Sequence, residues 1–242
     1  MFPNYGLTMV GHSLGAACAA LVAIMLRPKY PNIRCLCYGP PGALVSQNMA
    51  LKCREFITTF IAGNDLVPSL DLDNMELLRN EVIELVARTK VPKHMALRKC
   101  CSAPKDLDAS VANIINQILY DKDKIPVSDY KKQMERFVEH QEKRQHDRGL
   151  ARVTLYPPGR IIHVKQQLRP DPTKSLRDKI QGRFVKPCKS TKKKEYSAIW
   201  AENDDFQEIL VKENMFAHHF PNAYLEFFEG MAEMLDIDNS KP

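Results

Sequence analysis

The chain has 242 residues, of which 44% are hydrophobic and 26% are charged. This is the composition of an ordinary globular protein, and it excludes the disordered, collagen-like and coiled-coil classes. Lys and Arg number 35 against 29 Asp and Glu, an excess too small and too scattered to indicate binding to nucleic acid. The seven cysteines have spacings that fit neither a disulfide framework nor a zinc site, which favours a reducing compartment.

An uncharged stretch at the start of the chain suits either a membrane span or a buried core. Residues 1–26 carry no charge, but no positively charged segment precedes them, and their strictly apolar part is only residues 14–26. A helix that spans a bilayer needs roughly 18 or more such residues. We therefore expect a buried strand and helix here, and no transmembrane segment in this chain.

The first hundred residues predict alternating strands and helices. Short β-rich runs are expected at 5–10, 33–38 and 56–62, a turn at 11–15, and helices at 16–26 and from Asp73 onward. Elements at these intervals predict a parallel sheet covered by helices, which is the α/β class. Cys18, Cys35 and Cys37 fall on these elements and are expected in the core.

The sequence pattern changes after the first hundred residues. Residues 93–148 are expected to form an insertion, either a regulatory lid or a passive segment. Within it, 108–120 is amphipathic, and 128–148 is expected as a solvated helix or a partly ordered stretch. Two strands are then expected within 151–165, on either side of a Pro-Pro-Gly turn. A basic loop at 169–194, a strand at 197–200 and a helix at 224–235 complete the prediction.

Residues 11–15, Gly-His-Ser-Leu-Gly, match the pattern G-x-S-x-G of a nucleophile elbow. In an elbow, a strained turn between a strand and a helix exposes the serine hydroxyl, and a glycine two residues to either side avoids a clash. A β-rich run precedes the pattern, and a helix of small residues follows it. We therefore predict that Ser13 is a nucleophile and that the Leu14 N–H is one donor of its oxyanion hole.

A serine nucleophile needs a carboxylate and a histidine, which follow it in that order in α/β-hydrolases. Asp65 lies just past the third predicted strand, where the acid is expected. Asp71 and Asp73 stand closer to the start of a helix, so capping is their expected role. The sequence thus predicts Asp65 as the acid.

Seven histidines compete for the role of the base. His12 lies within the elbow, and three others, at 94, 140 and 146, lie near or in the insertion. His163 alternates with hydrophobic residues and is expected to be a satisfied residue of a strand. His218 and His219 lie in a loop before the last helix, and spacing alone leaves the choice between them open.

Four segments together resemble the class-three lipases, and among these the sn-1-specific diacylglycerol lipases. They are the elbow region 5–42, the acid run 56–72, the strand run 155–164 and the tail 199–228. The resemblance implies an α/β-hydrolase fold with Ser13 as nucleophile and Asp65 as acid. It implies His219 as the base, because this residue begins a His-x-Pro motif that matches the family's tail.

The same resemblance implies hydrolysis of the sn-1 ester of diacylglycerol, which gives a 2-monoacylglycerol and a fatty acid and feeds endocannabinoid signalling in animals. It also implies a lipid substrate at the cytoplasmic face of the plasma membrane. Stimulation by Ca2+ is implied as well, although no calcium loop is readable. The alternatives are a broader triacylglycerol lipase, a phospholipase A1, or an inactive truncated product with a binding or regulatory role.

Compared with the family, this sequence starts shortly before the elbow. We expect residues 1–242 to be a partial lipase domain whose elbow strand has an exposed edge. A second oxyanion donor belongs to an earlier loop in the family, so the chain is expected to fold poorly and to hydrolyse little. Cys100-Cys101 could carry palmitate or be an unmodified pair. The basic cluster of Arg183 and the lysines within 186–194 could face an anionic leaflet or only solvent.

Overall fold

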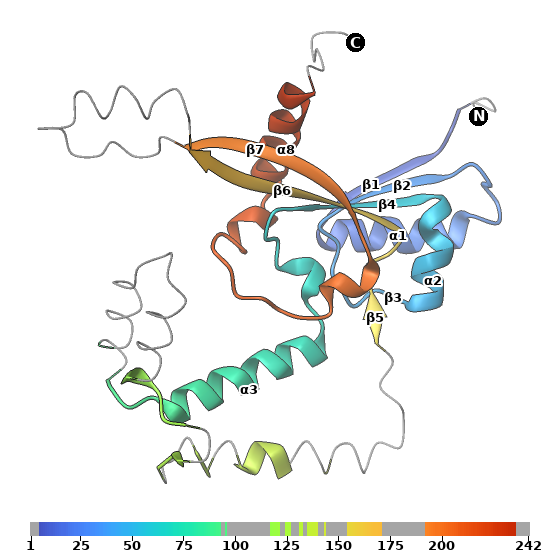
Figure 1. The fold of residues 1–242 in the computed structure, drawn as a ribbon. Coiled ribbons are helices and arrows are strands. Elements are labelled where there is room, and N and C mark those ends of the chain that lie inside the picture. Colours follow the sequence, from blue (N-terminus) through green and yellow to red (C-terminus); the bar gives the residue numbers. More distant parts are fainter. Residues whose placement is uncertain are drawn as a thin grey trace, which may run out of the picture. The chain divides into compact units, whose positions relative to one another are not determined.

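A computed structural model describes residues 5–92, 95, 117–121, 124–126, 131–132, 135–139, 143, 154–170 and 192–235. The chain forms two compact units, Met1–Asn74 with Val153–Pro242, and Met75–Arg152. The strands are β1 Thr8–His12, β2 Arg34–Tyr38, β3 Val45–Ser46, β4 Ile57–Ala62, β5 Leu155–Tyr156, β6 Arg160–Pro170 and β7 Lys192–Ala201. The helices are α1 Leu14–Leu26, α2 Gln47–Lys52, α3 Leu72–Arg88 and α8 Pro221–Met234 (Figure 1).

The first unit contains a five-stranded sheet in the order β1-β2-β4-β6-β7. The strands β1, β2, β4 and β6 run parallel, and β7 returns antiparallel along β6. Figure 1 shows β6 and β7 as one long twisted pair. A mostly parallel sheet flanked by helices confirms the predicted α/β class and is consistent with the α/β-hydrolase fold.

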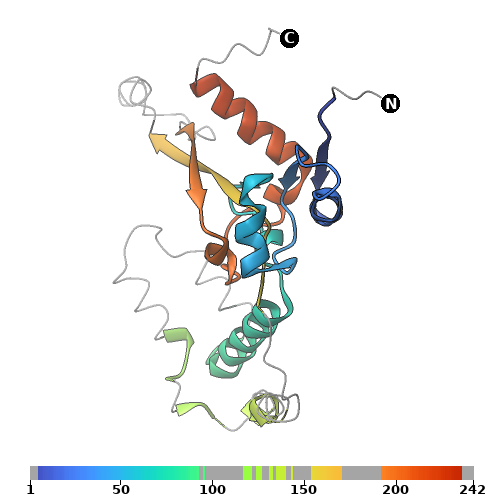
Figure 2. The ribbon, with the colours of Figure 1, turned by 90° about the vertical axis from the view of Figure 1, so that its right-hand side faces the viewer.

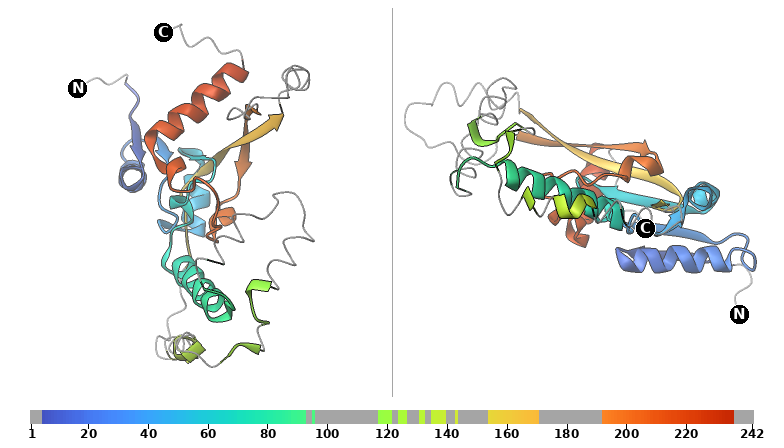
Figure 3. Two further views of the ribbon diagram at one scale, coloured as in Figure 1. Left: turned by 90° about the vertical axis from the view of Figure 1, so that its left-hand side faces the viewer. Right: turned by 90° about the horizontal axis from the view of Figure 1, so that it is seen from below.

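Helices α1 and α8 cover opposite faces of this sheet. Successive residues of a strand point to opposite sides, so neighbouring residues of one strand show which helix covers each face. Cys37 and Ile57 pack with the alanines of α1. On the same two strands, Tyr38 and Phe60 pack on the other face, against a cluster that contains Phe227 of α8. The two helices can be followed in Figures 2 and 3. A fully buried side chain such as Phe227 contributes about 1.5–3 kcal/mol.

Small residues let α1 approach the sheet closely. Its buried residues are Ala16, Ala17, Ala19, Ala20 and Ala23. Cys18 lies on the other face of the helix and is exposed, so its predicted place in the core is wrong. Cys35 and Cys37 are buried, as predicted, on the face of the sheet that α1 covers.

Several element boundaries differ from the predicted ones. β1 extends to His12 and α1 begins at Leu14, so the predicted turn over 11–15 is a single residue. Helix α8 begins at Pro221 instead of 224, since proline suits the first position of a helix. Strand β7 begins at Lys192 and therefore takes in the end of the predicted basic loop.

The short elements β3, β5 and α2 show what sequence periodicity misses. β3 pairs antiparallel with β5, and both strands are two residues long. β5 and β6 flank the Pro-Pro-Gly turn, as predicted, although β5 pairs with β3 instead of β6. Neither β3 nor α2 was predicted, because two to six residues are too few to display a period.

Helix α3 starts near the predicted residue and runs into the second unit. The Asp71 carboxylate accepts a hydrogen bond from the Asn74 N–H at 2.7 Å, which is the predicted cap. At the other end of α3, Arg88 Nε donates to the Tyr120 carbonyl at 2.8 Å. Among the described residues, no helix has the length and apolar character needed to cross a membrane.

Much of the predicted insertion lies outside the described residues. The residues outside the description include most of the amphipathic segment 108–120, part of 128–148, and the pair Cys100-Cys101. Most of the predicted basic loop, residues 171–191, also lies outside them. The roles predicted for these segments stay predictions.

Candidate active site

The Gly-His-Ser-Leu-Gly motif forms a one-residue turn between β1 and α1. Ser13 has φ 55° and ψ −127°, a left-handed conformation that costs a non-glycine residue about 1–3 kcal/mol. Two sets of backbone hydrogen bonds hold it there. The Ser13 N–H donates to the Tyr38 carbonyl at 2.9 Å, and the Ser13 carbonyl accepts from the N–H groups of Ala16 and Ala17 at 3.0 and 3.2 Å.

The two glycines of the motif have different surroundings. A Cβ on Gly11 would run into the backbone of Gly15 and Ala16, so this position has no room for a side chain. A Cβ on Gly15 would meet nothing within 4 Å among the described residues. The predicted crowding on both sides of Ser13 is therefore present at Gly11 and wrong for Gly15.

Three predicted site residues from distant parts of the chain meet beside this turn. The Ser13 hydroxyl lies 2.8 Å from His219 Nε2, and His219 Nδ1 lies 3.0 and 3.1 Å from the two carboxylate oxygens of Asp65. Because an ionised carboxylate only accepts, Nδ1 carries the proton and Nε2 is free to accept one from Ser13. This is the geometry of a nucleophile, a base and an orienting acid.

Asp65 follows the end of β4, and its side chain is fully buried. Besides His219, its carboxylate accepts hydrogen bonds from the Val67 N–H at 2.9 Å and from the Tyr224 hydroxyl at 2.6 Å. Burial, together with the charge of Asp65, raises the pKa of Tyr224 well above its ordinary value, so the phenol stays protonated and donates. A buried carboxylate with several donors is satisfied while ionised.

Sequence reasoning missed Tyr224. Its only signal in the sequence is its place one turn into the last helix, shortly after His219. His12 also has an unpredicted contact, because its Nε2 donates to the His219 carbonyl at 2.7 Å. The rings of His12 and His219 lie 4.8 Å apart. Tyr224 thus holds the acid, and His12 holds the backbone of the predicted base.

The structure separates the two adjacent histidines that spacing left open. His219 contacts both Ser13 and Asp65, whereas His218 Nδ1 accepts a hydrogen bond from the Asn64 N–H at 2.9 Å. His163 Nε2 donates to the Gly63 carbonyl at 2.6 Å, so it is satisfied within its strand as predicted. The histidines at 94, 140 and 146 lie outside the described residues.

Leu14, the predicted oxyanion donor, is the first residue of α1. The first N–H groups of a helix have no partner within it, and the helix dipole favours negative charge beside them. Leu14 N–H is therefore placed next to Ser13 in the way that the prediction requires. Its catalytic role, like those of Ser13, Asp65 and His219, stays a prediction.

A cavity of about 300 Å3 adjoins the turn that carries Asp65, on the side of His163 and Phe206. Its lining contains both signs of charge, with Lys165 and Lys212 beside Asp205. Ser13 and His219 do not line it, so it lies behind the acid and apart from the nucleophile.

The predicted dependence on calcium finds no support among the described side chains. Within this part of the chain, no three His, Cys, Asp or Glu side chains gather as a metal would require. Asp65 is occupied by its own donors. Calcium stimulation stays a prediction.

Comparison with known proteins finds one family model that matches the segment with the elbow and the acid. The model of the family described as lipase (class 3) matches residues 1–75, which include Ser13, Leu14 and Asp65. Residues 1–75 are thus similar to class 3 lipases. His219 lies outside the matched range, so its place in the site rests on the geometry and on the longer relatives.

Relatives that match nearly the whole chain are diacylglycerol lipases. The chain is 30% identical to diacylglycerol lipase-alpha of Homo sapiens over 98% of its length, and 31% identical to diacylglycerol lipase-beta of Mus musculus over 92%. The secreted mono- and diacylglycerol lipase A of Penicillium cyclopium is 42% identical over 30% of this chain and 25% of its own. The predicted resemblance to these class 3 lipases is confirmed.

The chain spans about a fifth of the length of the human diacylglycerol lipase-alpha and about a third of the mouse diacylglycerol lipase-beta, 20% and 32% respectively. The matched part of the alpha form covers both the elbow and the tail with His219, since 98% of this chain aligns. The similarity therefore spans all three residues of the candidate site.

Proposed function

We propose that this chain carries the catalytic residues of a serine lipase that hydrolyses the sn-1 ester of diacylglycerol to a 2-monoacylglycerol and a fatty acid. The observation that carries the proposal is the continuous contact from Ser13 through His219 to the buried Asp65. Such a chain of contacts activates a hydroxyl that is otherwise a weak nucleophile. The substrate class is supported by the names of the diacylglycerol lipases that this chain resembles.

In the proposed reaction, Ser13 Oγ attacks the ester carbonyl while its proton passes to His219 Nε2. Asp65 keeps the imidazole oriented and stabilises its charge, and the Leu14 N–H binds the developing oxyanion. His219 then gives the proton to the departing glyceride oxygen, which leaves an acyl group on Ser13. Water, activated by the same histidine, releases the fatty acid and restores the serine.

We further propose that the reaction takes place at a membrane surface, at the cytoplasmic face of the plasma membrane. The substrate itself is the support for this location, since a diacylglycerol with two acyl chains resides in a bilayer. Stimulation by Ca2+ is tested separately, by comparing the turnover rate in EGTA with the rate in excess Ca2+. A rate that does not respond would remove calcium from the proposal.

The substrate proposal is tested by presenting the chain with vesicles that contain diacylglycerol, triacylglycerol or phosphatidylcholine. Since the chain is expected to hydrolyse little, we expect slow release of fatty acid from diacylglycerol, from the sn-1 position first, and no release by the Ser13→Ala variant. Faster release from triacylglycerol or phosphatidylcholine would instead support a broader lipase or a phospholipase A1. If the parent chain and Ser13→Ala release equal amounts from all three lipids, the proposal is wrong.

A further inference from the structure

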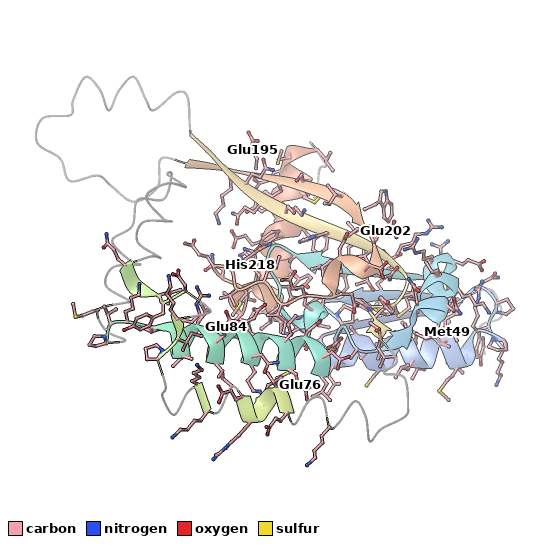
Figure 4. All side chains as sticks on the ribbon, turned by 60° about the horizontal axis from the view of Figure 1, so that its bottom comes forward. Met49, Glu76, Glu84, Glu195, Glu202 and His218 are labelled. Atoms are coloured by element: carbon pink, nitrogen blue, oxygen red, sulfur yellow. The ribbon has the colours of Figure 1, made fainter. Side chains whose placement is uncertain are left out.

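We propose that His218 is a positioning residue, which holds the turn that carries Asp65 as long as its imidazole is neutral. This inference rests on the proposed function, because it concerns the same site. The contacts of His218 are with Asn64 and Phe227, so it acts on the site through the turn that precedes the acid. In Figure 4 it is labelled in the segment that precedes α8.

The turn at Gly63 and Asn64, called the acid turn here, is held from two sides. From β6, the Val164 carbonyl accepts the Gly63 N–H at 2.7 Å, and His163 Nε2 donates to the Gly63 carbonyl at 2.6 Å. From the other side, His218 Nδ1 accepts the Asn64 N–H at 2.9 Å. Since Asp65 is the next residue, these bonds fix the direction in which its carboxylate leaves the turn.

The contact between His218 and the acid turn is close. Gly63 has φ +54°, and a Cβ on it would collide with His218 Nδ1 and with the ring of Phe227. The ring of Phe227 also packs edge-on against the His218 ring, with centroids 5.2 Å apart. The imidazole is therefore confined between the glycine and the phenylalanine, with Nδ1 facing the Asn64 N–H.

A bond accepted by Nδ1 exists only in the neutral imidazole. In the protonated ring both nitrogens are donors, so Nδ1–H would face the Asn64 N–H and the bond would be lost. Burial is the largest influence on the pKa of His218 and lowers it, and Lys194 of β7 acts in the same direction. Asp65 and Glu226 of α8 oppose this shift. At neutral pH, His218 Nδ1 therefore accepts the Asn64 N–H, and protonation of the ring in acid removes this acceptor.

Two substitutions of similar shape at position 218, to leucine and to asparagine, separate loss of the hydrogen-bond acceptor from loss of the ring. Leucine and asparagine have the same branched outline, and both lose the ring contact with Phe227. Only asparagine keeps an oxygen near the position of Nδ1, and it does not titrate. We expect a fluorophosphonate probe to label Ser13 roughly tenfold more slowly in His218→Leu than in the parent chain, because displaced catalytic groups lose rate steeply. His218→Asn is expected to recover most of the rate.

The pH dependence separates positioning from simple packing. Labelling falls in acid in every variant, because protonated His219 cannot accept a proton. The ratio of the parent rate to the His218→Asn rate cancels this effect. We expect that ratio to fall only once the pH is below the lowered pKa of His218, and hence below the ordinary histidine value of about 6.5, because only the parent protonates at position 218. A ratio that stays constant, or equal rates in the Leu and Asn variants, overturns the proposal.

Hydrogen exchange tests the same inference without any activity. We expect amides in the peptide 57–66 to exchange faster in His218→Leu than in His218→Asn, and in the parent faster at pH 5.5 than at pH 7.5 after correction for intrinsic rates. Equal exchange in the two variants overturns the inference even if labelling is absent. Absence of labelling in the parent chain, with the exchange difference present, contradicts the proposed function and leaves the role of His218 in the turn intact.

Discussion

The two sides of the candidate site are built in different ways. On the nucleophile side, the strained residue Ser13 lies between two consecutive elements, β1 and α1, and backbone hydrogen bonds hold it. On the acid and base side, polar side chains join residues that are far apart in the sequence. Asp65 meets Tyr224, His12 meets the His219 carbonyl, and Asn64 meets His218.

This difference determines what each side tolerates. The elbow depends on the absence of a side chain at Gly11, so its failure is steric. The acid and base side depends on donors and acceptors, so it fails when a single polar atom is removed or protonated. A substitution at Gly11 should therefore act mainly on folding, whereas loss of a polar atom on the acid and base side should also change the rate or its pH dependence.

The largest effect is expected where the two sides meet. Replacement of His219 by alanine removes the group that connects Ser13 to Asp65. We expect labelling and hydrolysis to fall at least about a thousandfold, as in other serine hydrolases without their base. Rates of probe labelling measure this, with His218→Asn as the control for the neighbouring position. A loss below tenfold would show that His219 is not the base.

A matched pair of glycine variants tests the elbow. Gly11→Ala places a methyl group against the backbone of Gly15 and Ala16, and we expect it to lower the free energy of unfolding by about 3 kcal/mol. Gly15→Ala has open space within α1, and we expect a gain of up to about 1 kcal/mol from helix propensity. Urea unfolding of both variants measures the difference. Equal stability of the two would contradict the steric account.

Removal of one oxygen tests the acid side. Tyr224→Phe loses the donor to Asp65 and keeps the ring, so we expect about 2 kcal/mol less stability and roughly tenfold slower labelling. Tyr30→Phe is the control, since it removes the same atom from an exposed tyrosine past the C-terminal end of α1, whereas Ser13 precedes its N-terminal end. If the two variants behave alike, Tyr224 has no special role in holding the acid.

The smallest expected effect is on stability as a function of pH. Burial lowers the pKa of both His163 and His218, so the unfolded chain takes up protons first as the pH falls below about 6.5. The free energy of unfolding is then expected to decrease with falling pH in this window. His163→Gln retains a donor for the Gly63 carbonyl and cannot titrate, so its urea midpoint should fall less between pH 7.5 and 5.5. An unchanged slope would contradict this explanation.

The fold and the nucleophile could be predicted because their signals are local. The G-x-S-x-G pattern, the alternating elements and the position of Asp65 past a strand all lie within short windows. The choice between His218 and His219 could not be made from spacing, since it depends on which ring faces Ser13 across more than 200 positions of sequence. Tyr224 and His12 were missed for the same physical reason, because their contacts are set by the packing of α8 against the sheet.

The central claim is that Ser13 is activated by His219 and Asp65 within this chain. It is tested most directly by treating the purified chain with a fluorophosphonate probe and identifying the labelled peptide by mass spectrometry. The account predicts one modified residue, Ser13, with labelling lost in Ser13→Ala and in His219→Ala. Labelling of the folded parent chain at another residue, or labelling of Ser13 that persists in His219→Ala, would contradict it.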